Sequence, residues 1–104
     1  MPIHLRAYKN RDEVYSLDAT WVISDLEIKH LGKVFENYKN RTGYYIEEYS
    51  DTFIAQGCFK PLQDAIIETL HSEEDKNIQA TLRKLLETTQ QVEKNNEGLA
   101  FIGE

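Results

Sequence analysis

The sequence predicts an α+β fold in which about three helices pack on a small β-sheet that includes the N- and C-terminal strands. Residues 3–8 alternate apolar and polar side chains, which is the pattern of a half-buried strand. Three later stretches carry apolar residues at helical spacing. Residues 99–103, LAFIG, form an apolar ending that can pair with the first strand. The 104 residues are expected to form one compact domain over 1–104.

The first helix is predicted from the signals at its two ends. Ser24 is followed three residues later by Glu27, which matches the capping box, and Gly43 offers a C-terminal stop. One helix is therefore expected from Ser24 to Gly43. Its buried stripe comprises Leu31, Val34, Phe35 and Tyr38. Before this helix, residues 14–23 mix β-branched and aromatic side chains without a clean period, which favours a short strand, a packed loop or both, with Trp21 in the core.

The middle of the chain predicts an extended segment followed by a second helix. Residues 44–54 are aromatic and β-branched, but Asp51 interrupts them, so an irregular or bulged extended segment is expected. The second helix is expected to begin at Phe59 and to end near His71. Pro61 lies in its first turn, where the missing amide of proline costs nothing.

The third helix is expected to begin at Ser72 and to run to about Asn95. Three acidic residues follow Ser72, and they suit the positive end of a helix dipole. Gly98 closes the helix before the terminal strand. The apolar stripe of this helix comprises Ile78, Leu82, Leu85, Leu86 and Val92.

Composition excludes several classes of protein. Twelve basic and 18 acidic side chains leave a net charge of -6, the wrong sign for direct nucleic-acid binding through phosphate neutralisation. The single cysteine, Cys58, cannot form an internal disulfide. No stretch of 18 apolar residues is present, and the first residues lack the apolar core of a signal peptide, so no membrane association and a cytoplasmic location are expected.

The motifs of catalysis and metal binding are absent from the sequence. It has no nucleophile elbow, no glycine-rich phosphate loop and no zinc-binding spacing. The residues that would have to converge on a metal are scattered: His4, His30, His71 and Cys58. Cys58 lies in a predicted helix-start region, where the helix dipole would lower the pKa of the thiol and make it reactive. A buried, inert thiol is the commoner arrangement. We therefore expect no enzyme, no cofactor and no metal site.

The acidity of the chain is local. Residues 44–75 hold one lysine against eight carboxylates, a balance of −7, whereas the flanking segments are close to neutral. The same segment is rich in tyrosine, a side chain that binding surfaces favour. A focused acidic field beside aromatic anchors suits a basic protein partner. The predicted partner-binding residues are Tyr44, Tyr45, Glu47, Glu48, Tyr49, Asp51, Asp64 and Glu68.

Three stretches carry a resemblance to a known class of protein. They are the predicted helix SDLEIKHLGKVFENYKNRTG, the following YYIEEYSDTF and the ending EGLAFIGE. In general character they resemble the small acidic immunity proteins of bacterial contact-dependent inhibition and related polymorphic toxin systems. The resemblance implies a stoichiometric inhibitor that performs no catalysis. By its likeness to inhibitors that cover a nuclease active site or an adjacent exosite, the expected partner is a basic toxin domain with nuclease activity.

Two other functions remain open at this stage, together with the oligomeric state. The first is a small helical adaptor or homodimeric structural protein, in which an exposed stripe on the third helix pairs with itself through Leu82, Leu85, Leu86 and Val92. The second is a small enzyme that uses Cys58 or a pair of carboxylates.

Overall fold

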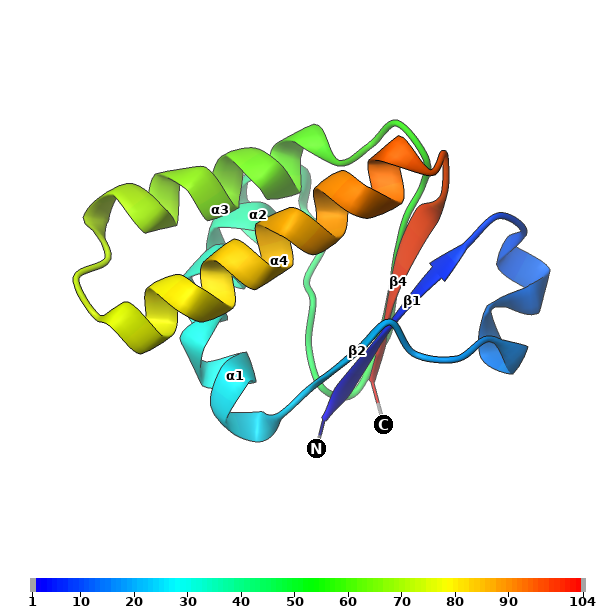
Figure 1. Ribbon diagram of the computed structural model, residues 1–104, viewed down its shortest axis with the longest axis horizontal. Helices are drawn as coiled ribbons and strands as arrows, with labels where there is room; N and C mark the ends of the chain where they lie inside the picture. The colour runs from blue at the N-terminus through cyan, green and yellow to red at the C-terminus, as the bar shows by residue number, and fades with distance from the viewer. Residues whose placement is uncertain (1, 104) are drawn as a thin grey trace.

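The computed structural model describes residues 2–103 and has the predicted α+β class, with a four-stranded antiparallel sheet in the order β2, β1, β4, β3. Four α-helices cover one face of this sheet, and a short 3-10 helix, η1, lies on the other side (Figure 1). In chain order the elements are β1 (Ile3–Tyr8), η1 (Arg11–Ser16), β2 (Trp21–Ile23), α1 (Asp25–His30), α2 (Gly32–Thr42), β3 (Asp51–Ile54), α3 (Lys60–Ser72), α4 (Lys76–Lys94) and β4 (Gly98–Gly103).

The core forms because the strands alternate their side chains between two faces. Leu5 of β1 and Phe101 of β4 are fully buried on the face that the helices cover, where the Phe101 ring meets Phe35 of α2 edge to face at 6.1 Å. The alternate residues point to the opposite face and form a smaller apolar cluster with η1. This second cluster contains Tyr8, Val14, Ala100 and Ile102.

The predicted strands and most helix signals are confirmed, but the first helix is two helices. Ser24 and Glu27 form the capping box, and Gly43 ends α2 in the left-handed conformation with a φ of 82°. Between these ends, Leu31 has a ψ of 1° and its N–H bonds to the carbonyls of both Glu27 and Ile28, so the last turn of α1 tightens. The next residue, glycine, begins α2 and has the weakest helix propensity after proline. Residues 2–103 thus form four α-helices where about three were predicted.

The predicted start of the last helix at Ser72 is wrong. Ser72 is the final residue of α3, and α4 begins at Lys76 with Asp75 as its N-cap. The Asp75 carboxylate accepts the N–H groups of Asn77 and Ile78 at 2.8 and 3.2 Å. An aspartate side chain caps as well as serine does, and here the aspartate directly precedes the apolar stripe.

The homodimer hypothesis requires an exposed apolar stripe on α4, and the structure buries this stripe within the chain. Leu82, Leu85 and Val92 of α4 are buried against the sheet and the other helices, and Leu86 packs against the same core. Trp21 is buried as expected, with the Lys84 ammonium of α4 4.4 Å from the centre of its ring. Within residues 2–103, none of the helices combines the length and the apolar character needed to cross a lipid bilayer.

Candidate functional site

Most of the predicted partner-binding residues lie in one irregular segment, the tyrosine loop, which we define as residues 43–50 between α2 and β3. The left-handed Gly43 turns the chain out of α2. The hydroxyl of Thr42 then accepts the N–H of Tyr44 at 3.1 Å and donates to the carbonyl of Tyr38. Ile46 is 1% exposed and anchors the middle of the loop in the core. With Ile46 held in the core, Tyr44, Tyr45, Glu47 and Tyr49 are exposed.

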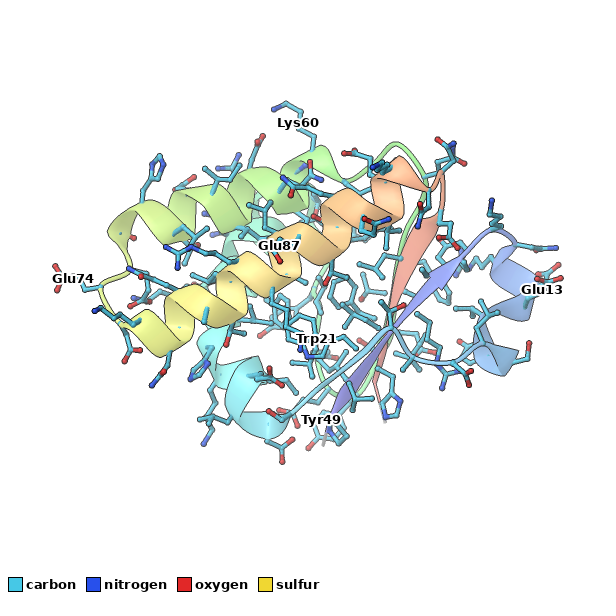
Figure 2. The ribbon with its side chains drawn as sticks, viewed as in Figure 1. Glu13, Trp21, Tyr49, Lys60, Glu74 and Glu87 are labelled. Atoms are coloured by element: carbon cyan, nitrogen blue, oxygen red, sulfur yellow. The ribbon has the colours of Figure 1, made fainter. Side chains whose placement is uncertain are left out.

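Three tyrosines are presented to solvent by this loop. Tyr44, Tyr45 and Tyr49 are 66%, 50% and 76% exposed, and they account for three of the seven large hydrophobic side chains that the described chain exposes. Lys39 of α2 lies 5.0 Å from the ring centre of Tyr45. Figure 2 shows Tyr49 at the end of the molecule opposite to Lys60. Such a concentration of exposed rings in eight residues exceeds the scattered apolar residues of an ordinary surface.

The acidic residues of the loop region differ in their partners. Glu47 is exposed, and its carboxylate forms no hydrogen bond or ion pair within residues 2–103, whereas Glu48 is half-buried. Asp51, the first residue of β3, accepts a hydrogen bond of 2.5 Å from the phenol of Tyr15 in η1. This bond raises the pKa of Tyr15 above its usual value, because the carboxylate favours the protonated phenol.

The two predicted partner-binding residues on α3 each form an ion pair with a basic side chain. Asp64 pairs with Lys60 at 3.2 Å, and Glu68 pairs with Arg41 at the end of α2. Each carboxylate therefore has a cation from the chain itself. Among the predicted partner-binding carboxylates, Glu47 is the one without a partner within residues 2–103.

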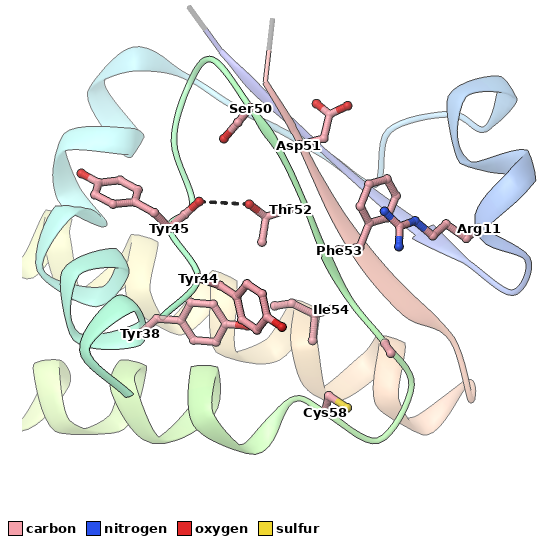
Figure 3. A pocket seen from close by; sticks show the side chains of 11 residues that line it. Arg11, Tyr38, Tyr44, Tyr45, Ser50, Asp51, Thr52, Phe53, Ile54 and Cys58 are labelled. Carbon is pink, nitrogen blue, oxygen red and sulfur yellow. Dashed lines mark hydrogen bonds between the residues drawn. The ribbon is translucent and has the colours of Figure 1, made fainter. Parts of the chain in front are cut away.

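An open pocket of about 510 Å³ separates the tyrosine loop from β3 (Figure 3). The hydroxyl of Thr52 donates to the carbonyl of Tyr45 at 3.1 Å and holds the loop to the strand. The buried ring of Tyr38 lines the pocket, and burial raises the pKa of this phenol. On the other side of β3, the guanidinium of Arg11 stacks on Phe53 with a centroid distance of 3.9 Å.

Cys58 is exposed and lies at the end of this pocket, so the expectation of a buried thiol is wrong. The turn at residues 55–58, closed by the Cys58 N–H bonding to the carbonyl of Ala55, places the side chain before α3 and outside the core. No histidine lines the pocket, because His4, His30 and His71 lie on β1, α1 and α3. The described residues contain no cluster of three or more His, Cys, Asp or Glu side chains that could hold a metal.

Sequence reasoning missed three of the residues that shape this pocket: Arg11, Tyr38 and Phe53. Arg11 and Phe53 are 42 positions apart, and only the pairing of β1 and β3 with β4 brings them together. The helical stripe indicates that Tyr38 is buried, but it does not show that one edge of its ring reaches a pocket. Only Phe53 carried a signal, since it lies in the aromatic segment 44–54.

Comparison of the chain with protein-family models, with curated proteins and with solved structures yields no match.

Proposed function

We propose that the chain is an immunity protein. It binds a basic toxin domain, which we propose to be a nuclease, and blocks this domain in the cytoplasm without catalysing a reaction itself. The observation that carries the proposal is the tyrosine loop, where three exposed tyrosines lie within three positions of Glu47, a carboxylate with no partner within residues 2–103. Rigid aromatic rings provide contact area at low entropic cost, and they are enriched among residues that dominate binding energy.

The charges around the loop support a cationic partner. Residues 44–59 contain Glu47, Glu48 and Asp51 but no lysine or arginine. A nuclease needs cations to hold phosphate, and carboxylates at the rim of an inhibitor attract those cations during diffusional encounter. We leave Asp64 and Glu68 out of the proposed surface, because Lys60 and Arg41 already compensate them and Lys60 lies opposite to Tyr49 (Figure 2).

The first experiment identifies the partner and tests the loop together. Tagged wild-type chain and a Tyr44→Ala/Glu47→Gln/Tyr49→Ala variant are used to capture proteins from a lysate of the source strain, and the captured domain is then produced alone. We expect growth arrest by that domain, rescue by the wild-type chain and no rescue by the variant. Circular dichroism confirms that the variant is folded.

Single variants separate the two kinds of contact in binding kinetics. Glu47→Gln should slow association severalfold at low salt and little at high salt, whereas Tyr49→Ala should mainly accelerate dissociation. Glu74→Gln is the matched control, because its exposed carboxylate also forms no contact and lies at the far end of α3 from the loop (Figure 2). Equal weakening by Glu74→Gln and Glu47→Gln, or capture of an acidic partner, would rule out the proposed surface.

A further inference from the structure

The outer edge of β3 has free backbone groups. β3 is the last strand of the sheet and pairs only with β4. The N–H of Gly103 donates to the carbonyl of Ser50 at 3.2 Å, and hydrogen-bonded pairs alternate along an antiparallel ladder. In this register Thr52 and Ile54 bond to β4, so the N–H and C=O of Phe53 point away from it. No backbone group within residues 2–103 bonds to Phe53 on that side.

The pocket described above lies along this edge. Six consecutive residues, 50–55, line it. Side chains of a strand alternate between its faces, so a pocket on one face would be lined by every second residue. Lining by consecutive residues places the pocket at the edge, beside the backbone of Phe53. In Figure 3 the tyrosine loop runs on the opposite side of the pocket, and Tyr44 and Tyr38 extend toward Ile54.

Proteins usually cover, charge or shorten an edge strand, because a free edge pairs with other chains. Here the tyrosine loop approaches β3 through the Thr52 hydroxyl, not through a backbone ladder. The space it leaves is flanked by aromatic rings. Residues 44–59 carry three carboxylates, and the one basic side chain among the described residues that line the pocket, Arg11, is stacked on Phe53. This edge therefore fits an extended chain segment with basic side chains.

We propose that β3 pairs with an extended, lysine- or arginine-containing segment of the partner, which adds a fifth strand to the sheet through the N–H and C=O of Phe53. This inference rests on the proposed function, since it specifies how the toxin domain is held. The main chain of the segment supplies affinity, and the tyrosines and Glu47 select its side chains.

Hydrogen exchange at single amides tests the pairing without the toxin. In the free chain we expect the Phe53 amide to exchange at least about tenfold faster than those of Thr52 and Ile54, because only the latter bond within the sheet. A seven-residue peptide of alternating lysine and valine should slow exchange at Phe53 and slow alkylation of Cys58, while a glutamate-valine peptide should do neither. Unchanged exchange of the Phe53 amide in the presence of the lysine peptide would overturn the proposal. Protection of this amide that rises with the concentration of the chain alone would also overturn it, because it would show that β3 pairs with a second copy of the chain.

A backbone modification tests the same bond in the complex. Gly57–Cys58 is a suitable junction for native chemical ligation, so residue 53 can be made N-methyl-phenylalanine with every side chain retained. The methyl group removes an N–H that the fold does not use, and it occupies the position of the added strand. We expect unchanged thermal unfolding and affinity for the captured toxin domain at least about tenfold weaker than for the unmodified ligated chain.

The outcomes separate this inference from the proposed function. Equal affinity of the methylated and unmodified chains for a toxin that the chain neutralises would refute the strand pairing and leave the proposed function standing. Protection of Phe53 by the lysine peptide, in a chain that neutralises no toxin, would refute the proposed function and support the pairing.

Discussion

At the scale of single residues, Gly98 of β4 lies in close contact with Tyr8 of β1 and with the backbone of β3. A Cβ atom on Gly98 would lie 2.5 Å from the Tyr8 ring and 2.9 Å from the carbonyl oxygen of Ile54. Gly98→Ala should therefore lower the free energy of unfolding by about 1–3 kcal/mol, measured in urea. Gly32→Ala is the control, since its Cβ would meet nothing within 4 Å, and it should stabilise by up to about 1 kcal/mol. Equal effects of the two changes would contradict this packing.

A second residue-scale prediction concerns the bond between Tyr15 and Asp51. Because this bond raises the pKa of Tyr15 above 10.0, the folded chain holds the phenolic proton more tightly than the unfolded chain does. Its contribution to stability is present below pH 10 and is lost as the pH rises through the raised pKa. Asp51→Asn should lower the pKa of Tyr15 toward its usual value, as followed by ultraviolet titration of the phenol and assigned with Tyr15→Phe. An unchanged titration would show that the carboxylate is not the cause.

At the scale of elements, the capping of α4 decides between two helix starts. Asp75→Ala should cost about 1 kcal/mol of stability, because two N–H groups of the first turn lose their acceptor. Ser72→Ala and Glu74→Ala should each cost less than about 0.5 kcal/mol. Within residues 2–103, the Ser72 hydroxyl donates to the carbonyl of Thr69 at the end of α3 and to no other group. A larger loss at Ser72 than at Asp75 would restore the helix start predicted from the sequence.

The elements that could be predicted are those whose signals are local. The capping box at Ser24, the left-handed Gly43 and the alternation of residues 3–8 each involve atoms within a few positions of one another. The interruption at Leu31 and the cap at Asp75 were missed because several neighbouring residues can terminate or cap a helix. Packing against the rest of the fold selects among them.

The candidate site divides in the same way. The excess of tyrosine and of acid in residues 44–51 follows from composition. The i,i+4 spacing of Lys60 and Asp64 is a local signal for their ion pair, which was not predicted. The pair Arg41–Glu68 joins α2 to α3, and the outward direction of the Phe53 backbone depends on the register of β3 with β4. Both depend on tertiary pairing, which the sequence of either partner alone does not specify.

At the scale of the whole molecule, the two central strands come from opposite ends of the chain. β4 lies between β1 and β3, and six residues of β1 pair with it. All but the last residue of β4 are buried. The four-stranded sheet therefore cannot form until β4 has paired with β1 and β3. Contacts that form early in folding are expected among the helices, because these are closer together in the sequence.

This topology predicts that removal of residues 98–104 abolishes cooperative folding, because β1 and β3 would lose their common partner. Circular dichroism should show residual helix without a sigmoidal thermal transition, and amide exchange in β1 should lose its protection. Phe101→Ala, which keeps the strand and its hydrogen bonds, is the graded control. Phe101 is fully buried against Phe35, so this change should cost about 3–5 kcal/mol and retain a single transition if enough stability remains. A truncated chain that still unfolds cooperatively would mean that the helices and the β1–β2 pair form a domain by themselves.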